Sequence, residues 1–168
     1  MGLARLWAGW RNEYIATATE ETQDGAACVF CRILDSGEPH AATYLVWRDE
    51  RVAVLLNAYP YTSGHVLVLP LRHAGRLQDL DPGESAALWS ATTDAVRAIE
   101  SAYSPGGVNL GANLGKAAGA GVPGHLHMHC LPRWAGDTNF LTSVAEARVL
   151  PEPLPVTWQK LRAAWPAG

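Results

Sequence analysis

The sequence predicts a single α+β domain, in which an antiparallel sheet of five strands packs with one long helix and a short C-terminal helix. Short segments rich in β-forming residues lie close together along the chain, and one long helical pattern separates them. No segment repeats at a period of about 20 to 50 residues, which excludes repeat architectures. Strands in neighbouring pairs with one main helix favour an antiparallel sheet over alternating parallel units.

Five segments carry the strand pattern. Residues 44–47 and 51–57 are rich in β-forming side chains on both sides of the polar residues 48–50, which predicts a hairpin. Three further strands are predicted over 64–70, 108–113 and 126–131.

A long helix is predicted over 82–103. Asp81 is typical of an N-cap, Pro82 of the first helical position, and Glu84 completes a capping box. Apolar residues then recur close to the helical period until residues 104–107, Ser-Pro-Gly-Gly, end the helix.

A second, short helix is predicted in the C-terminal tail, residues 151–168. Four prolines interrupt this tail, while Trp158, Leu161 and Trp165 form an amphipathic patch between them. We expect this helix to pack against the rest of the domain.

The composition is that of a soluble globular protein: 48% of the residues are hydrophobic and 17% are charged. No stretch approaches the roughly 18 apolar residues of a membrane span. The segment from Met1 to Ile15 carries charges where a signal peptide has an apolar block, so we expect a cytoplasmic protein. A net charge of −3 provides no basic surface for nucleic acid.

Three histidines alternate with apolar residues at the start of the last predicted strand. Because side chains alternate faces along a strand, His125, His127 and His129 share one side of it. Neutral imidazole is a competent nucleophile toward phosphorus, provided that a carbonyl or a neighbouring side chain holds its second nitrogen. The run therefore predicts a site directed at phosphate.

Other interpretations of this run stay open at the level of the sequence. The three histidines are also suited to a catalytic metal, as in cupins or metallohydrolases, and chelators would then abolish activity. A non-enzymatic alternative is a nucleotide-binding or zinc-stabilised interaction module, which would bind AMP and cleave no dinucleotide.

A glycine-rich segment, residues 109–124, leads directly into the histidines. Glycine allows backbone N–H groups to crowd around an anion, so this segment can surround the same phosphate. The alternative is a flexible connection, which the position next to the histidines disfavours.

Cys28 and Cys31 stand at Cys-x-x-Cys spacing, and Cys130 stands alone. In a chain without an export signal, this spacing indicates a metal or redox site rather than a disulfide framework. A tetrahedral zinc site needs two further ligands, which histidines must supply. The alternative is a pair of reduced thiols near a turn. Parity places Cys130 in the core, away from the histidines.

Residues 125–131 resemble the His-φ-His-φ-His-φ-φ signature of the histidine-triad superfamily. Residues 132–137 are similar to the Pro-Arg-x-x-Gly-Asp that follows the triad in the fragile-histidine-triad branch, and Asn57 with residues 64–68 resembles that branch's Asn and Gly-His-Val-Leu-Val. The resemblance covers about residues 28 to 140.

The resemblance implies roles for individual residues. The middle histidine of the family is nucleotidylated, so His127 is the expected nucleophile, and His129 is the second catalytic residue, placed at the phosphate. Between Ala120 and Val122 the loop departs from the family, where a glutamine and a hydroxyl residue often stand. The nucleotide-binding residues implied are Asn57, His65, Asn113, Gly119, Gly121 and His129.

The resemblance also implies a metal site. His73 is similar to the histidine of a Pro-x-x-His motif in bacterial triad proteins, in which the first triad histidine is the usual fourth ligand. A structural zinc ion with all four positions occupied by protein is therefore expected. Its ligands are Cys28, Cys31, His73 and His125.

The flanks at 6–11 and 148–152 resemble those of bacterial, notably actinobacterial, diadenosine tetraphosphate phosphorylases and related hydrolases. They imply an enzyme that attacks the α-phosphate of an adenine nucleotide or a dinucleoside polyphosphate, with an adenosine 5'-monophosphoramidase as the alternative. They also imply a homodimer. The expected single domain comprises an N-terminal segment (1–27), a histidine-triad core (28–140) and a C-terminal extension (141–168).

Overall fold

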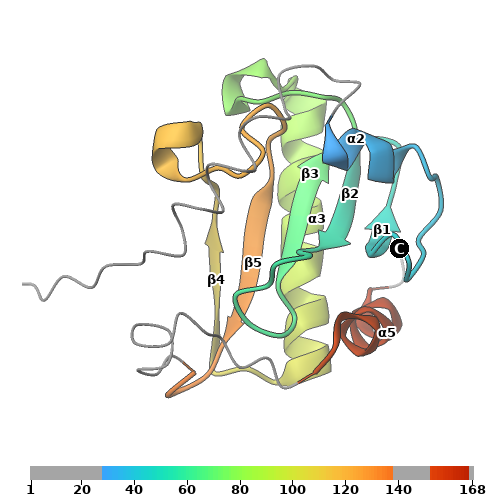
Figure 1. Cartoon of the computed structure of the whole chain (residues 1–168), viewed down its shortest axis with the longest axis vertical. Helices are drawn as coiled ribbons and strands as arrows, with labels where there is room; N and C mark the ends of the chain where they lie inside the picture. The colour runs from blue at the N-terminus through green and yellow to red at the C-terminus, as the bar shows by residue number, and fades with distance from the viewer. Residues whose placement is uncertain (1–27, 138–151, 167–168) are drawn as a thin grey trace, which may run out of the picture.

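The computed structural model describes residues 28–137 and 152–166 (Figure 1). The expected N-terminal segment 1–27, with the flank at 6–11, lies outside the described residues. So do the first part of the C-terminal extension and all of the second flank except Glu152.

The described residues form one antiparallel sheet of five strands in the order β1-β2-β3-β5-β4. This confirms the predicted strand number and sheet type. Each predicted strand is present, with ends that differ by at most two residues. The strands are β1 (Leu45–Arg48), β2 (Val52–Leu56), β3 (Val66–Pro70), β4 (Gly107–Gly111) and β5 (Met128–Arg133).

The last strand begins at Met128 rather than at the predicted residue 126. Polar groups just before Met128 bond outside the sheet ladder. The N–H of Leu126 donates to the carbonyl of Ala74 at 2.7 Å, and the carbonyl of His125 contacts the ring of His127 at 2.8 Å. The histidines therefore straddle the start of the strand, which the alternation of residue types alone does not reveal.

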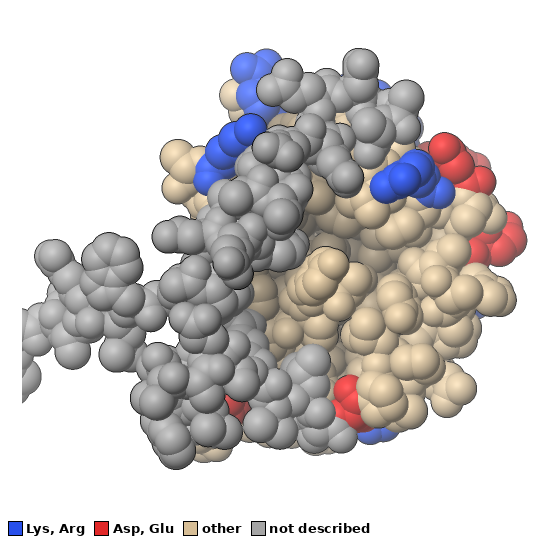
Figure 2. Space-filling view, in the orientation of Figure 1, with Lys and Arg blue, Asp and Glu red and all other residues tan. Residues whose placement is uncertain are grey.

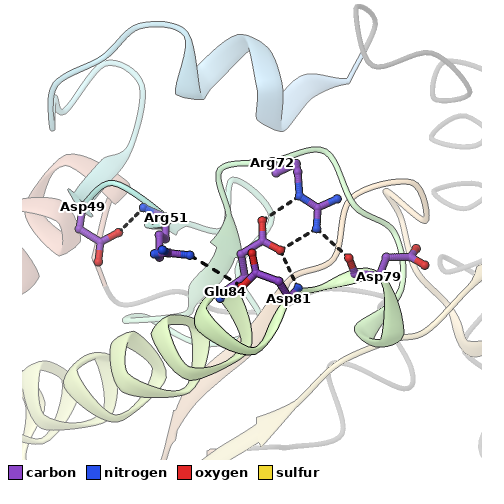
Figure 3. A network of polar contacts seen from close by, with 6 residues as sticks. All are labelled: Asp49, Arg51, Arg72, Asp79, Asp81 and Glu84. Carbon is purple, nitrogen blue, oxygen red and sulfur yellow. Dashed lines mark hydrogen bonds and ion pairs between the residues drawn. The ribbon is translucent and has the colours of Figure 1, made fainter.

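Helix α3 (Pro82–Tyr103) has the predicted bounds and lies against one face of the sheet (Figure 1). Both halves of the capping box form: Glu84 N–H donates to Asp81, and Asp81 N–H donates to Glu84. Arg72 holds the same glutamate through two hydrogen bonds, at 2.8 and 2.6 Å (Figure 3).

The predicted C-terminal helix is α5 (Leu154–Ala164), which packs beside α3 and the sheet edge at β1. Trp158 donates its indole N–H to the carbonyl of Leu45 at 2.8 Å, and Trp165 stacks on Trp47.

The structure adds three short helices that the sequence analysis does not predict. They are α2 (Val29–Leu34), η2 (Leu77–Asp79) and η3 (Lys116–Ala118). No described helix combines the length and apolarity needed to cross a membrane.

The two faces of the sheet carry separate hydrophobic clusters. Val54 and Val68 point to the cluster beneath α3, together with Leu126 and Cys130, as parity predicts for both. Leu55, Leu67 and Leu69 point to the opposite face, where α2 covers them. His129 pairs with Leu67 in the sheet and lies on this second face. In the view of Figure 2, charged side chains of the described residues lie toward the rim of the molecule.

Candidate active site

The imidazole of His127 is buried and held by the backbone. Its Nδ1 lies 2.8 Å from the carbonyl oxygen of His125. A carbonyl only accepts, so Nδ1 carries the hydrogen and Nε2 keeps the lone pair. Burial lowers the pKa of His127, which keeps the ring neutral near pH 7. The expected orienting carbonyl is therefore present, and Nε2 has the electronic state of a nucleophile.

His129 is oriented by a chain of hydrogen bonds that starts at the backbone. The N–H of Tyr61 donates to Nδ1 of His65 at 3.1 Å. The hydrogen of His65 therefore lies on Nε2, which donates to Nδ1 of His129 at 2.9 Å. His129 must then carry its own hydrogen on Nε2.

The outer nitrogen of His129 is a buried donor, and no group of the described residues accepts its hydrogen. Burial, followed by the nearby His127, lowers the pKa of His129 to about 4, so its ring is neutral. The ring centroids of His127 and His129 are 5.0 Å apart. The lone pair on Nε2 of His127 and the N–H donor of His129 thus lie side by side. Attack at phosphorus requires the first group, and binding of a phosphate oxygen requires the second.

Asn57 lies at the same end of the site. Its Nδ2 is 3.3 Å from Nδ1 of His65, and its Oδ1 accepts the N–H of Tyr59 at 3.0 Å. Thr62 donates to the carbonyl of Pro132 at 3.2 Å and so joins this loop to β5. Two of the predicted nucleotide-binding residues, Asn57 and His65, are therefore in contact with one another.

The glycine-rich loop folds back on itself. Asn113 Nδ2 donates to the carbonyl of Gly119 at 3.4 Å, and the N–H of Gly119 donates to Lys116 at 2.9 Å. Gly121 follows, half-buried, before the loop reaches His125, whose N–H donates to Val122 at 3.3 Å. The predicted residues of this loop are thus brought together, while no hydrogen bond between described residues joins their side chains to His127.

The Cys-x-x-Cys pair meets two histidines in a compact cluster. The ligand atoms of Cys28, Cys31, His73 and His125 all lie within 4.8 Å of one another. Three sulfur-to-Nδ1 distances are 3.5 Å (Cys28 to His125), 3.4 Å (Cys31 to His73) and 3.6 Å (Cys31 to His125). With Zn–S of about 2.3 Å and Zn–N of about 2.05 Å, a tetrahedral site separates sulfur from nitrogen by about 3.6 Å. The donor set and its spacing fit zinc.

The surroundings of the cluster also fit a metal. Nε2 of His125 lies 2.8 Å from the carbonyl of Pro70, which fixes its hydrogen there and leaves Nδ1 free to coordinate. Burial lowers the pKa of His125 to about 4. Burial, followed by the neighbouring Cys28, raises the pKa of Cys31 to about 11. A cation between the two sulfur atoms would oppose this rise by stabilising the thiolate.

The cluster separates the three triad histidines by environment. Among the described residues it is the one group of three or more suitable side chains that could hold a metal ion, and it contains neither His127 nor His129. The alternative in which all three triad histidines bind a catalytic metal therefore has no support in this geometry.

Sequence reasoning missed two residues of the site. Phe30 packs against His125 and His127, and the backbone of Tyr61 orients His65. The position of Phe30 between the two cysteines is the sequence signal that could have identified it as a residue of the site. The role of Tyr61 rests on its N–H, for which the residue type carries no signal.

The family model of the HIT domain matches residues 38–136 of this chain. The chain belongs to the HIT domain family. An AP-4-A phosphorylase from Mycobacterium tuberculosis is 36% identical over 167 residues, which cover 97% of this chain and 85% of the relative. An asymmetrical bis(5'-nucleosyl)-tetraphosphatase from Schizosaccharomyces pombe is 37% identical over 91 residues, 54% of this chain and 50% of that protein.

Solved structures of HIT proteins share the fold. A Zn-bound histidine triad family protein from Mycobacterium smegmatis superposes with a TM-score of 0.67 at 32% identity, covering 84% of this chain and 94% of the other. A hypothetical histidine triad nucleotide-binding protein from Sulfolobus tokodaii gives 0.66 at 29% identity, covering 82% and 91%. The predicted HIT-like α+β fold is thereby confirmed.

Proposed function

We propose that this HIT protein cleaves adenine dinucleotides, with diadenosine tetraphosphate as its substrate, through a nucleotidyl intermediate on His127. The neutral His127, with its Nε2 lone pair beside the buried N–H of His129, carries the proposal. The similarity to an AP-4-A phosphorylase and to a bis(5'-nucleosyl)-tetraphosphatase supports the choice of substrate.

In the first step, Nε2 of His127 attacks the α-phosphorus. The N–P bond forms while the bond from phosphorus to the bridging oxygen breaks, and ATP leaves. His127 acquires positive charge, which the carbonyl of His125 stabilises through the Nδ1 hydrogen. The N–H of His129 donates to a phosphate oxygen, where negative charge is concentrated.

In the second step, an acceptor attacks the adenylyl phosphorus and His127 departs as a neutral ring. Attack by water gives AMP, and attack by inorganic phosphate gives ADP. We propose phosphate as the acceptor, since the relative that spans 97% of the chain is an AP-4-A phosphorylase. An adenosine 5'-monophosphoramidase uses the same nucleophile and is the second candidate.

We also propose a structural zinc ion in the Cys28, Cys31, His73 and His125 cluster. The three sulfur-to-nitrogen distances and the carbonyl on His125 support it, as does a Zn-bound relative. When bound, the ion would supply a cross-link between three parts of the chain, with no coordination position left for substrate.

The catalytic proposal is tested with diadenosine tetraphosphate in the presence and absence of inorganic phosphate. Formation of ADP and ATP only with phosphate identifies a phosphorylase, whereas AMP and ATP identify a hydrolase. His127→Asn should abolish turnover and retain nucleotide binding, while the control His40→Asn, on an exposed loop, should keep both. Binding of AMP without cleavage of any dinucleotide by the wild type would contradict the proposal.

We further propose a homodimer in which the sheets of two copies join. Within the described residues, β4 pairs with β5 on one side and with nothing on the other, and Leu110 is exposed on it. Light scattering should give twice the mass of one chain, and a single-chain mass would contradict the proposal.

A further inference from the structure

Phe30 lies between the two cysteines of the metal cluster and against the proposed nucleophile. Its side chain is buried, with 7% exposed. Its ring centroid is 5.6 Å from that of His125, at an interplanar angle of 88°, and 5.1 Å from that of His127, at 64°. Both are edge-type contacts, the geometry that aromatic rings favour. One side chain thus touches a cluster ligand and His127 together.

The last turn of the helix that carries Phe30 is held by Arg48, which donates to the carbonyl of Leu34 at 3.0 Å, whereas its first turn lacks such a bond. Helix α2 has six residues, and no side chain caps its first turn. Cys28 is its N-cap and Cys31 lies one turn later. Coordination of both sulfur atoms would tie this turn to His73 and His125, because the cluster distances fit one ion.

The ring of His127 needs more than its hydrogen bond to be fixed. The bond from Nδ1 to the carbonyl of His125 sets one edge of the ring, and the ring can still tilt about it. Phe30 packs on one side and His129 lies 5.0 Å away on another. Removal of the Phe30 ring frees His127 to tilt, which displaces Nε2 from the line of attack.

We propose that Phe30 is a positioning residue that orients the imidazole of His127 and transmits metal binding at the cysteine cluster to it. Two routes then lead from the cluster to the nucleophile. One passes through the backbone of His125, and the other passes through the ring of Phe30. The kinetic part of this inference rests on the proposed function, whereas the orientation of His127 does not.

The test compares Phe30→Leu and Phe30→Met, which keep an apolar side chain, with Phe30→Tyr, which keeps the ring. Val29→Ala is the matched control on the same helix, since Val29 is partly exposed and makes no ring contact with a histidine. Zinc content is measured by mass spectrometry, and kcat and KM are measured with diadenosine tetraphosphate.

Phe30→Leu and Phe30→Met should retain one zinc ion per chain and lose about tenfold in kcat, because small displacements of reacting groups are costly. KM should change by less than about twofold, and Phe30→Tyr should restore kcat. An unchanged kcat in zinc-loaded Phe30→Leu would overturn the inference. A raised KM at constant kcat would also overturn it, because that result would show that Phe30 only lines the substrate pocket.

The second readout is the imidazole resonance of His127 in nitrogen-15 spectra, assigned by its loss in His127→Asn. Removal of zinc should shift this resonance in the wild type and in Val29→Ala, and should shift it less in Phe30→Leu and Phe30→Met. Equal shifts in all four proteins would refute the coupling. If the wild type cleaves no dinucleotide, the proposed function fails, and this measurement still decides the role of Phe30.

Discussion

The three triad histidines have the same chemistry and differ in their neighbours. His125 turns Nδ1 toward two cysteines. His127 turns Nδ1 toward a carbonyl, and His129 turns Nδ1 toward His65. In each ring the partner of one nitrogen decides what the other nitrogen can do. The neighbours therefore separate one residue type into a ligand candidate, a nucleophile candidate and a phosphate donor candidate.

His65 should control the donor state of His129. In His65→Leu, Nδ1 of His129 loses its donor, so the ring hydrogen can move to Nδ1 and Nε2 then repels phosphate oxygen. We expect kcat/KM to fall by about 100-fold, the range for loss of one such donor. Activity assays and the nitrogen-15 tautomer signature of His129 check this, with His40→Leu as the control. Full activity with the hydrogen still on Nε2 would show that His65 does not orient the ring.

Gly64 should be irreplaceable for two separate reasons. Its φ is +85°, and an added Cβ would lie 3.0 Å from both Tyr103 and Pro132. Gly37 has a similar φ of +87° with open space around it, so Gly37→Ala measures the backbone strain alone. We expect Gly64→Ala to lower the free energy of unfolding by about 1 to 3 kcal/mol, more than Gly37→Ala. Urea denaturation measures both, and equal losses would eliminate the contact contribution.

At the scale of elements, one cap joins the start of α3 to the turn after β3. Glu84 closes the capping box with Asp81 and binds Arg72, which also donates to the carbonyl of Asp79 at 2.7 Å (Figure 3). The hydrogen bond from Arg72, followed by that from the backbone of Asp81, lowers the pKa of Glu84 from 4.5 to about 2.

This cap should make folding stability depend on pH in acid. Because the pKa is lower in the folded state, Glu84 contributes stability above about pH 4.5, and that contribution is lost as the pH falls toward 2. Glu84→Gln should be less stable at pH 6 and should show a flatter decline between pH 4.5 and 2. Thermal unfolding across this range measures it. Parallel pH curves for the two proteins would contradict the lowered pKa.

The same elements show what the sequence can predict. The sequence predicts helix α3 with its bounds because its caps are local and its apolar period runs over 22 residues. The six residues of α2 carry too short a pattern, and two of the residues that they contact, His73 and His125, lie 42 and 94 residues beyond Cys31. The predicted start of β5 is wrong by two residues because a side chain bonds the backbone there.

The same distinction between local patterns and long-range contacts applies to the site. Alternation along the chain correctly placed the histidines opposite Leu126 and Cys130, because parity is a local property. The hydrogen bond from His65 to His129, which continues the one from Tyr61, spans 64 residues and depends on tertiary packing. No local pattern carries that information.

At the scale of the whole molecule, the cysteine and histidine cluster connects α2 to the ends of the paired strands β3 and β5. Cys28 is the N-cap of α2 and Cys31 lies within it, while His73 follows β3 and His125 precedes β5. An ion bound only in the folded state stabilises it by mass action. Since the sheet, α3 and α5 share their own core, loss of the ion should weaken the fold without abolishing it.

Zinc removal should therefore lower stability by a measurable increment. At free zinc of about 100 times Kd, bound metal contributes about 2.7 kcal/mol to the free energy of unfolding. Cys31→Ser should lose this increment, so that a chelator destabilises the wild type and leaves the variant unchanged. Cys130→Ala is the matched control: Cys130 is buried in the cluster beneath α3, so its loss should lower stability while the zinc increment remains. Denaturation with and without chelator measures all three proteins. A chelator effect that persists in Cys31→Ser would place the ion elsewhere, whereas its absence from the wild type would mean that the cluster does not hold the fold together.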